Sequence, residues 1–183
     1  MSPFPRRRFR ARGARLESVA PDPHALGLVL LTRREWSVRQ LRDRLLADGC
    51  PPADTEAAVE RLLRDGALDD ARVAAAHVRT AARVKHRGRL RILRELQAMG
   101  IADETARAAV DEAVPEEDAE AALERELSRR LKPPVDDRQV RRVFAALVRL
   151  GFAPGEVGRA LRRRTRGDGG DGGDGTLGAG ALD

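Results

Sequence analysis

The sequence repeats one short pattern three times at a fixed spacing. The segments 45–50, 96–101 and 147–152 each begin with a leucine four positions before a glycine, and an apolar residue follows that glycine directly. The glycines stand at positions 49, 100 and 151, so both intervals are 51 residues. Apolar residues also recur eight positions before each glycine and ten positions after it. A regular period of this length is typical of a repeat protein made of stacked helical units.

Each repeat is predicted to contain a helix, a glycine stop and a second helix. In the first repeat, Val38, Leu41 and Leu45 lie three and four positions apart, which places them on one face of a helix. Glycine readily adopts the left-handed conformation that ends many helices, and no phosphate-binding glycine motif surrounds the repeated glycines. The predicted structural stops are Gly49, Gly100 and Gly151.

The amino-acid composition favours packed helices over a sheet. The chain of 183 residues has four Phe, one Trp and no Tyr, so Leu, Val, Ile and Ala must form its core. The single cysteine, Cys50, rules out an internal disulfide and falls at an apolar position of the repeat, which predicts a buried thiol. The apolar run 25–31 is too short to cross a bilayer, and residues 1–15 lack the apolar region of a secretory signal. We therefore expect a soluble all-α protein of the reducing cytoplasm that makes no membrane contact.

Changes in composition divide the chain into six parts. Six arginines with little apolar content at the start predict a flexible basic arm, and a tract of Gly and Asp at the end predicts a disordered tail. The predicted parts are the basic arm at 1–22, a leading helix at 23–35, a first repeat at 36–84, a second repeat at 85–132, a third repeat at 133–166 and the tail at 167–183.

Polar residues mark several predicted helix starts. Ser37 is followed three positions later by Gln40, which is the capping-box pattern. Asp69 and Asp70 follow the glycine at 66, where an aspartate can cap a further helix. Two adjacent aspartates could also belong to a metal or acid–base site, but no partner residues are evident in the sequence. Capping is therefore the favoured interpretation of Asp69 and Asp70.

Charge is distributed along the chain in blocks. Residues 71–94 contain eight basic residues and no acid, 101–128 contain ten acids and two arginines, and 129–166 contain twelve basic residues and three acids. The net charge of +6 fits an anionic polymer or an acidic protein surface as partner, and it fits a solvated arginine-rich surface equally well. The acidic stretch 103–126 could face basic loops of a partner or neutralise the neighbouring basic repeats.

An ordered set of motifs resembles the RecX family of regulatory proteins. The motifs are Gly66-Ala67-Leu68-Asp69-Asp70, Val73-Ala74 with Val78, Gly88-x-x-Arg91-Ile92-x-x-Glu95-Leu96 ending in Gly100-Ile101, and Arg149-Leu150-Gly151-Phe152. The resemblance implies an elongated, curved array of tandem three-helix repeats without enzymatic activity. It also implies a partner, the RecA filament on single-stranded DNA, whose growth, ATP hydrolysis, strand exchange and coprotease activity the family restrains. Val73 stands where the family usually has Phe, and the Gly/Asp tail is not part of the family pattern.

The predicted contact surface for this partner consists of basic residues at the end of the first repeat, in the second repeat and in the third repeat. A curved array presents a long surface, so several weak contacts along it could bridge several RecA protomers. The same basic face could also contact single-stranded DNA. The predicted partner-binding residues are Arg79, Arg83, Lys85, Arg87, Arg89, Arg91, Arg94, Arg138, Arg141 and Arg142.

Two other classes of function fit the sequence less well. Short helices joined by glycine turns also resemble helix-turn-helix units, so a direct, non-specific DNA-binding module is the alternative. Against it, the chain has no polar recognition helix, and Trp36 leaves few platforms for base stacking. An enzyme is not supported, because the three histidines lack metal-ligand spacing and no nucleophile motif is present. We predict no cofactor and no small-molecule substrate.

Overall fold

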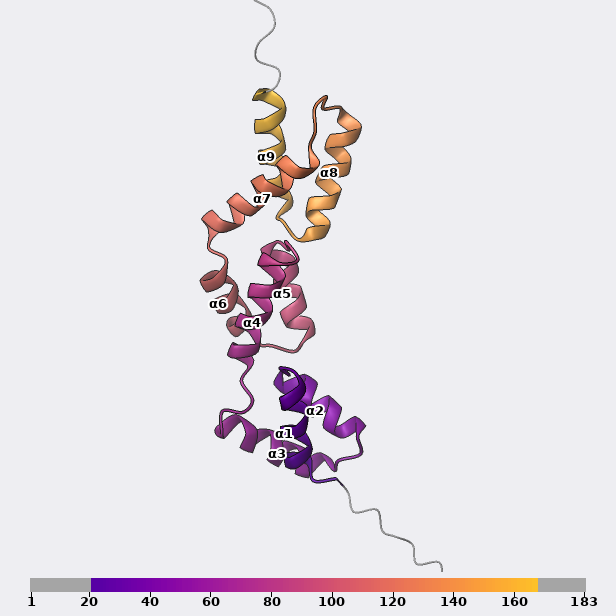
Figure 1. Cartoon of the computed structure of the whole chain (residues 1–183), viewed down its shortest axis with the longest axis vertical. Coiled ribbons are helices and arrows are strands. Elements are labelled where there is room, and N and C mark those ends of the chain that lie inside the picture. Colours follow the sequence, from indigo (N-terminus) through magenta and orange to yellow (C-terminus); the bar gives the residue numbers. More distant parts are fainter. Residues whose placement is uncertain (1–20, 168–183) are drawn as a thin grey trace, which may run out of the picture.

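The computed structural model describes residues 21–167, and within this range the chain is entirely helical apart from its connections (Figure 1). The all-α prediction is therefore confirmed for the described residues. The predicted basic arm and tail lie almost wholly outside that range. The helices are α1 (Pro23–Arg33), α2 (Val38–Ala47), α3 (Pro52–Arg64), α4 (Asp70–Arg83), α5 (Arg89–Ala98), α6 (Asp103–Ala113), α7 (Glu116–Arg130), α8 (Asp137–Leu150) and α9 (Pro154–Gly167).

The helices form three units of three, and the units follow one another along the long axis of the molecule (Figure 1). The first unit is α1–α3, the second is α4–α6 and the third is α7–α9. Each unit has its own cluster of buried apolar side chains, centred on Leu41 and Leu62, on Ile92 and Val110, and on Leu147 in the third unit. Tandem three-helix repeats in an elongated arrangement are therefore present, as the resemblance to the RecX family implied.

The helix contacts group the chain differently from the predicted division. The packing begins each unit one helix earlier, so that α1 is part of the first unit and α4 opens the second unit. The reason lies in α4, whose buried face of Val73, Ala74 and Val78 packs into the cluster of α5 and α6. The predicted repeats at 36–84, 85–132 and 133–166 instead attached α4 and α7 to the units that precede them.

Local residue chemistry sets the helix ends. The three repeat glycines each follow a helix and have positive φ angles of 87°, 83° and 96° in chain order. The Ser37 side chain and Gln40 form a reciprocal capping box at the start of α2. The Asp69 carboxylate accepts hydrogen bonds from the first turn of α4, and Asp136 accepts one at the start of α8. Side-chain capping thus fixes where α2, α4 and α8 begin.

The units are joined through the ends of their middle helices α2, α5 and α8. At the first junction, the hydroxyl of Ser37 donates to the carbonyl oxygen of Met99 at 2.5 Å. At the second junction, the backbone N–H of Gly88 donates to the carbonyl oxygen of Leu150 at 2.8 Å. Positions 37 and 88, like 99 and 150, are one 51-residue period apart, so both junctions join equivalent positions, one through a side-chain hydroxyl and the other through a backbone N–H.

Further bonds reinforce this end-to-end arrangement. The N–H of Leu90 donates to the carbonyl oxygen of Gly151 at 3.1 Å, and a guanidinium nitrogen of Arg91 donates to that of Arg149 at 3.1 Å. The carboxylate of Asp70 accepts from the backbone N–H of Val38, at the start of α2, at 2.9 Å. In each junction the C-terminal carbonyls of one middle helix face the N-terminal end of the middle helix in the preceding unit, so α5 faces α2 and α8 faces α5. This arrangement also aligns the helix dipoles favourably.

Candidate partner-binding surface

The first group of predicted contact residues lies on the outer side of α4 and in the loop that follows it. Arg79, Arg83 and Lys85 are exposed, and none of them forms an ion pair with a residue between positions 21 and 167. Their outward position follows from the packing of α4, which buries Val78 and Ala81 on its opposite side. These three cationic groups are therefore available to an external anion or carboxylate.

The second group is engaged inside the second unit around Glu95. The guanidinium groups of Arg87 and Arg91 both donate to the Glu95 carboxylate, with Arg91 Nε at 2.9 Å from Oε1. The Nε2 atom of His77 lies 3.0 Å from Glu95 Oε2. Four side chains from α4, α5 and the loop between them thus meet at one carboxylate. Arg87 and Arg91 are part of the fold before any partner arrives.

The environment of Glu95 shifts its acidity. Burial alone would raise the pKa of this carboxyl group, but hydrogen bonds from Arg91, His77 and Arg87 outweigh burial and hold the pKa below its ordinary value. The carboxylate is therefore charged at neutral pH and neutralises part of the basic block. Removing one of these arginines would disturb this cluster as well as the surface.

Arg89 and Arg94 also make contacts within the second unit. The guanidinium group of Arg89 donates to the Asp111 carboxylate and to the backbone carbonyl of Val114, which ties the start of α5 to the end of α6. Arg94 is exposed, and its Nε donates to the carbonyl oxygen of Leu90 on its own helix at 3.1 Å. Arg89 therefore links α5 to α6 within the unit, whereas most of the Arg94 side chain remains accessible.

The third group lies on α8, in the third unit. Arg138, Arg141 and Arg142 are exposed and form no ion pair with any residue that the structure describes. The structure does not bring them together with the α4 group, since α4 and α8 belong to different units (Figure 1). The predicted contact residues are thus spread over two units of the stack.

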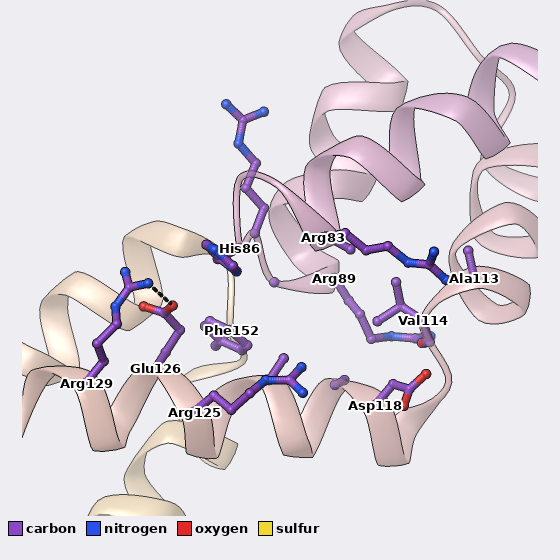
Figure 2. A pocket seen from close by; sticks show the side chains of 15 residues that line it. Arg83, His86, Arg89, Ala113, Val114, Asp118, Arg125, Glu126, Arg129 and Phe152 are labelled. Carbon is purple, nitrogen blue, oxygen red and sulfur yellow. Dashed lines mark hydrogen bonds and ion pairs between the residues drawn. The ribbon is translucent and has the colours of Figure 1, made fainter.

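A cavity of about 390 Å³ lies where the second and third units meet. Figure 2 shows α7 along one wall, with Arg125, Glu126 and Arg129, and the segment that carries Arg83 and Arg89 opposite. Between them the lining is apolar, and it includes Ala82, Ala113, Val114, Ala119, Ala122 and Phe152. The lining also contains the carboxylates of Asp118 and Glu126, and ion pairs hold Arg87, Arg89 and Arg129. The guanidinium groups of Arg83 and Arg125 therefore remain for an anionic group that carries a flat or apolar part.

Three basic side chains that line this cavity, those of His86, Arg125 and Arg129, were not predicted as contact residues. Arg125 and Arg129 lie four positions apart on α7 and so share one side of that helix, and Glu126 holds Arg129 at 3.3 Å. His86 is exposed and is the one non-glycine residue with a positive φ angle, 50°, among those the structure describes. The spacing of the two arginines was visible in the sequence, but their position opposite α4 depends on the fold.

Half of the acids in the stretch 103–126 neutralise basic residues of this chain. Five of its ten acids form ion pairs, three of them with arginines on other helices: Asp111 with Arg89, and Glu120 and Glu124 with Arg163. The other two are paired along their own helices. Of the two uses that the sequence left open, internal neutralisation accounts for these five acids.

Residues 21–167 contain neither a cluster of metal ligands nor a membrane-spanning helix. No group of three or more His, Cys, Asp or Glu side chains there could hold a metal ion. None of the described helices is long and apolar enough to cross a membrane.

Comparison with known proteins identifies the family. Residues 25–62 match the family model described as RecX, first three-helix domain, and residues 69–110 match RecX, second three-helix domain. A protein from Xanthomonas oryzae pv. oryzae named Regulatory protein RecX is 38% identical over 159 residues, which cover 86% of this chain and 94% of that protein. This chain belongs to the RecX family. The two matched ranges coincide with α1–α3 and α4–α6, so the family domains follow the packing units described above.

Other members of the family support the assignment. A protein of the same name from Acidithiobacillus ferrooxidans is 45% identical over 80 residues, which cover 44% of this chain and 53% of that protein. The crystal structure of RecX from Lactobacillus salivarius aligns with a TM-score of 0.65 at 17% identity, over 79% of this chain and 95% of that one. At this identity the likeness shows a shared fold. The sequence-based resemblance to RecX is confirmed.

Proposed function

We propose that this chain binds the RecA filament on single-stranded DNA and restrains its extension, ATP hydrolysis, recombination and coprotease activity, and that it thereby regulates DNA repair and the SOS response. The observation that carries the proposal is membership of the RecX family along most of the chain, with a relative named as a regulatory protein. The mechanism needs no chemistry at the interface.

The elongated stack suits a long, repetitive partner. Three units joined end to end place the exposed cationic groups of α4 and α8 at separate points along one molecule (Figure 1). Several weak contacts at a fixed spacing give high avidity only to a surface with matching spacing. If that spacing occurs in a filament form that cannot add the next monomer, binding shifts the population toward that form.

We propose that only the exposed members of the basic block contact the filament. Arg79, Arg83 and Lys85 on one unit, and Arg138, Arg141 and Arg142 on the next, are exposed and free of ion pairs within 21–167. Arg94 is exposed as well. Arg87, Arg89 and Arg91 are held by carboxylates of the same unit. We assign to these three the role of supporting the surface, and to the exposed residues the contact itself.

ATP hydrolysis by RecA already assembled on single-stranded DNA tests the proposal. This chain is added in amounts too small to coat the DNA, and filament length is followed in parallel by electron microscopy. We expect hydrolysis to fall while the filaments shorten. Loss of hydrolysis only at DNA-coating amounts would contradict the proposal.

Matched charge reversals locate the contact. The variant that combines Arg79→Glu with Arg83→Glu is expected to lose most of its inhibition of RecA, because both arginines are exposed and lie outside the buried face of α4. The control combines Arg61→Glu with Arg64→Glu on α3, where both residues are also exposed. Equal loss of inhibition in both variants would show a general charge effect rather than a contact at α4.

Direct, non-specific DNA binding is the second candidate, and the exposed, unpaired cations favour it. When the logarithm of the binding constant is plotted against the logarithm of the salt concentration, each phosphate contact with single-stranded DNA contributes about −0.7 to the slope. A salt titration on naked single-stranded DNA measures how many such contacts form. A steep slope together with activity that does not require RecA would put this function first.

A further inference from the structure

A shallow apolar groove lies between α8 and α9 in the third unit. Val140, Phe144, Gly158 and Leu161 form its floor, and its volume is about 360 Å³. Phe144 is the largest apolar side chain on α8, yet it is 36% exposed. Large aromatic side chains are usually buried, and exposed ones in a concave surface often mark a binding site.

The 51-residue register explains why the groove is open in this unit. Phe144 and Gly158 correspond, two periods earlier, to Arg42 and Glu56 of the first unit. There the guanidinium group of Arg42 donates to both carboxylate oxygens of Glu56 at 2.6 and 2.9 Å, so an ion pair bridges α2 and α3. Gly158 has no side chain to form such a bridge. A Cβ atom added to Gly158 would have one neighbour within 4 Å beyond the adjacent residues and the backbone of its own helix. That neighbour is Arg162 Nη1, at 3.4 Å.

The rim of this groove is cationic. Arg141 on α8 and Arg162 on α9 line it, and the remaining polar lining residue is Thr165. Neither arginine forms an ion pair with any residue in the described part of the chain, and no carboxylate lines the groove. Guanidinium groups bind carboxylates strongly in a paired geometry, while the floor between them favours an apolar side chain.

We propose that this groove binds an acidic peptide segment of a partner protein. One large apolar side chain of the segment packs on Phe144, and flanking carboxylates pair with Arg141 and Arg162. A nucleic-acid strand matches less well, because its phosphates would use the arginines but leave the apolar floor uncovered. Any protein that carries such a segment could supply it, and Arg141 is the one residue of this groove that also belongs to the surface proposed to contact RecA.

Fluorescence anisotropy with the full chain tests this site. The probe is a fluorescein-labelled peptide of alternating Asp and Glu with one central Phe, and its matched control carries Ala in place of that Phe. We expect the Phe peptide to bind at least about tenfold more tightly, since its ring leaves water when it packs on Phe144. Affinity is also expected to fall with salt, because two ion pairs contribute.

Two variants on α9 separate the groove from the rest of the surface. Gly158→Leu fills the groove and is expected to weaken the Phe peptide at least about tenfold. Gly155→Leu lies on the same helix outside the groove, where an added Cβ has ample room, and it should leave the affinity unchanged. Both changes replace a helical glycine by a stronger helix former, so both variants should stay folded, which circular dichroism can verify.

Several results would overturn the proposal. Equal affinity for the Phe and Ala peptides would reduce the site to a charged surface, as would unchanged binding by Gly158→Leu. Binding of an oligothymidylate that Gly158→Leu weakens as much as it weakens the peptide would assign the groove to nucleic acid. A concentration-dependent dimer that Gly158→Leu abolishes would assign it to a second copy. Much tighter peptide binding by a chain ending at Gly167 would make the aspartate-containing segment 168–183 the occupant.

Discussion

Replacing Gly151 by alanine is expected to destabilise the protein far more than the same change at Gly49. Both glycines occupy one repeat position and both have a left-handed backbone, with φ angles of 96° and 87°. A Cβ atom on Gly49 would meet nothing within 4 Å, whereas one on Gly151 would lie 2.3 Å from Arg91 Cβ and 2.6 Å from the Arg91 backbone nitrogen. The pair therefore separates backbone strain from crowding at the junction between units.

The two costs can be estimated separately. A non-glycine residue in the left-handed region costs about 1–2 kcal/mol, and this is the whole cost expected for Gly49→Ala. At Gly151 the start of α5 must also move away, because carbon atoms normally approach no closer than about 3.5 Å. Crowding of this kind costs about 1–3 kcal/mol, and weakening the two hydrogen bonds of Gly88 and Leu90 adds about 0.5–1.5 kcal/mol each. Gly151→Ala should therefore cost roughly 3–8 kcal/mol.

Urea unfolding followed by far-ultraviolet circular dichroism measures both values. Gly88→Ala is the matched control for crowding alone, since Gly88 has an ordinary φ angle of −75° but an added Cβ would lie 2.3 Å from the backbone of Gly151. We expect this variant to be closer to Gly151→Ala than to Gly49→Ala. Equal costs at Gly49 and Gly151 would refute the argument that contact between units at this junction stabilises the stack.

Three further measurements follow from the structure. The folded-state pKa of Glu95 is lowered, so the stability that this carboxylate provides is fully present above its unfolded-state pKa of about 4.5 and is lost as pH falls through the folded-state pKa. The difference in unfolding free energy between the native chain and Glu95→Gln should therefore shrink below about pH 4.5. A difference that stays constant with pH would contradict this. Asp70→Ala should lower the free energy of unfolding in urea by about 0.5–2 kcal/mol, because Asp70 caps α2 across the junction. The same loss is expected for Asp69→Ala, which removes the cap of α4. No loss at Asp70 would argue against the contact across the junction. Burial raises the pKa of the Cys50 thiol, so alkylation by iodoacetamide should be much slower in the folded chain than in urea, and equal rates would show that the thiol is accessible.

The sequence was sufficient to predict helical repeats, but it did not show where each unit begins. A 51-residue period defines the spacing between equivalent residues and leaves the starting helix undetermined. The start depends on the neighbour against which α4 buries Val73 and Val78, and both α3 and α5 are adjacent to it in the sequence. Helical periodicity identifies the apolar face of α4 without identifying the surface that covers it. Only the packed structure determines this choice.

The candidate contact surface was predictable in part for a similar reason. The concentration of arginine was visible, and the pair Arg91 and Glu95 has the four-residue spacing at which opposite charges meet on a helix. The partner of Arg89, in contrast, is Asp111, which lies 22 positions away and becomes adjacent only when α5 and α6 pack. Charge counts therefore located the basic block in the sequence, while the division into ion-paired and unpaired arginines required tertiary structure.

Some equivalent positions of the units maintain the junctions, whereas others differ in a way that changes the surface. At the junctions, Ser37 and Gly88 differ chemically, yet a hydroxyl group and a backbone N–H donate to equivalent carbonyl groups, so the geometry is kept. At the groove position, Arg42 and Phe144 also differ, but there the ion pair of one unit gives way to an uncovered ring in another. A substitution that keeps the same bond preserves the stack. One that removes a bond leaves a surface open for a partner, and we expect the binding specificity of the chain to lie at such positions.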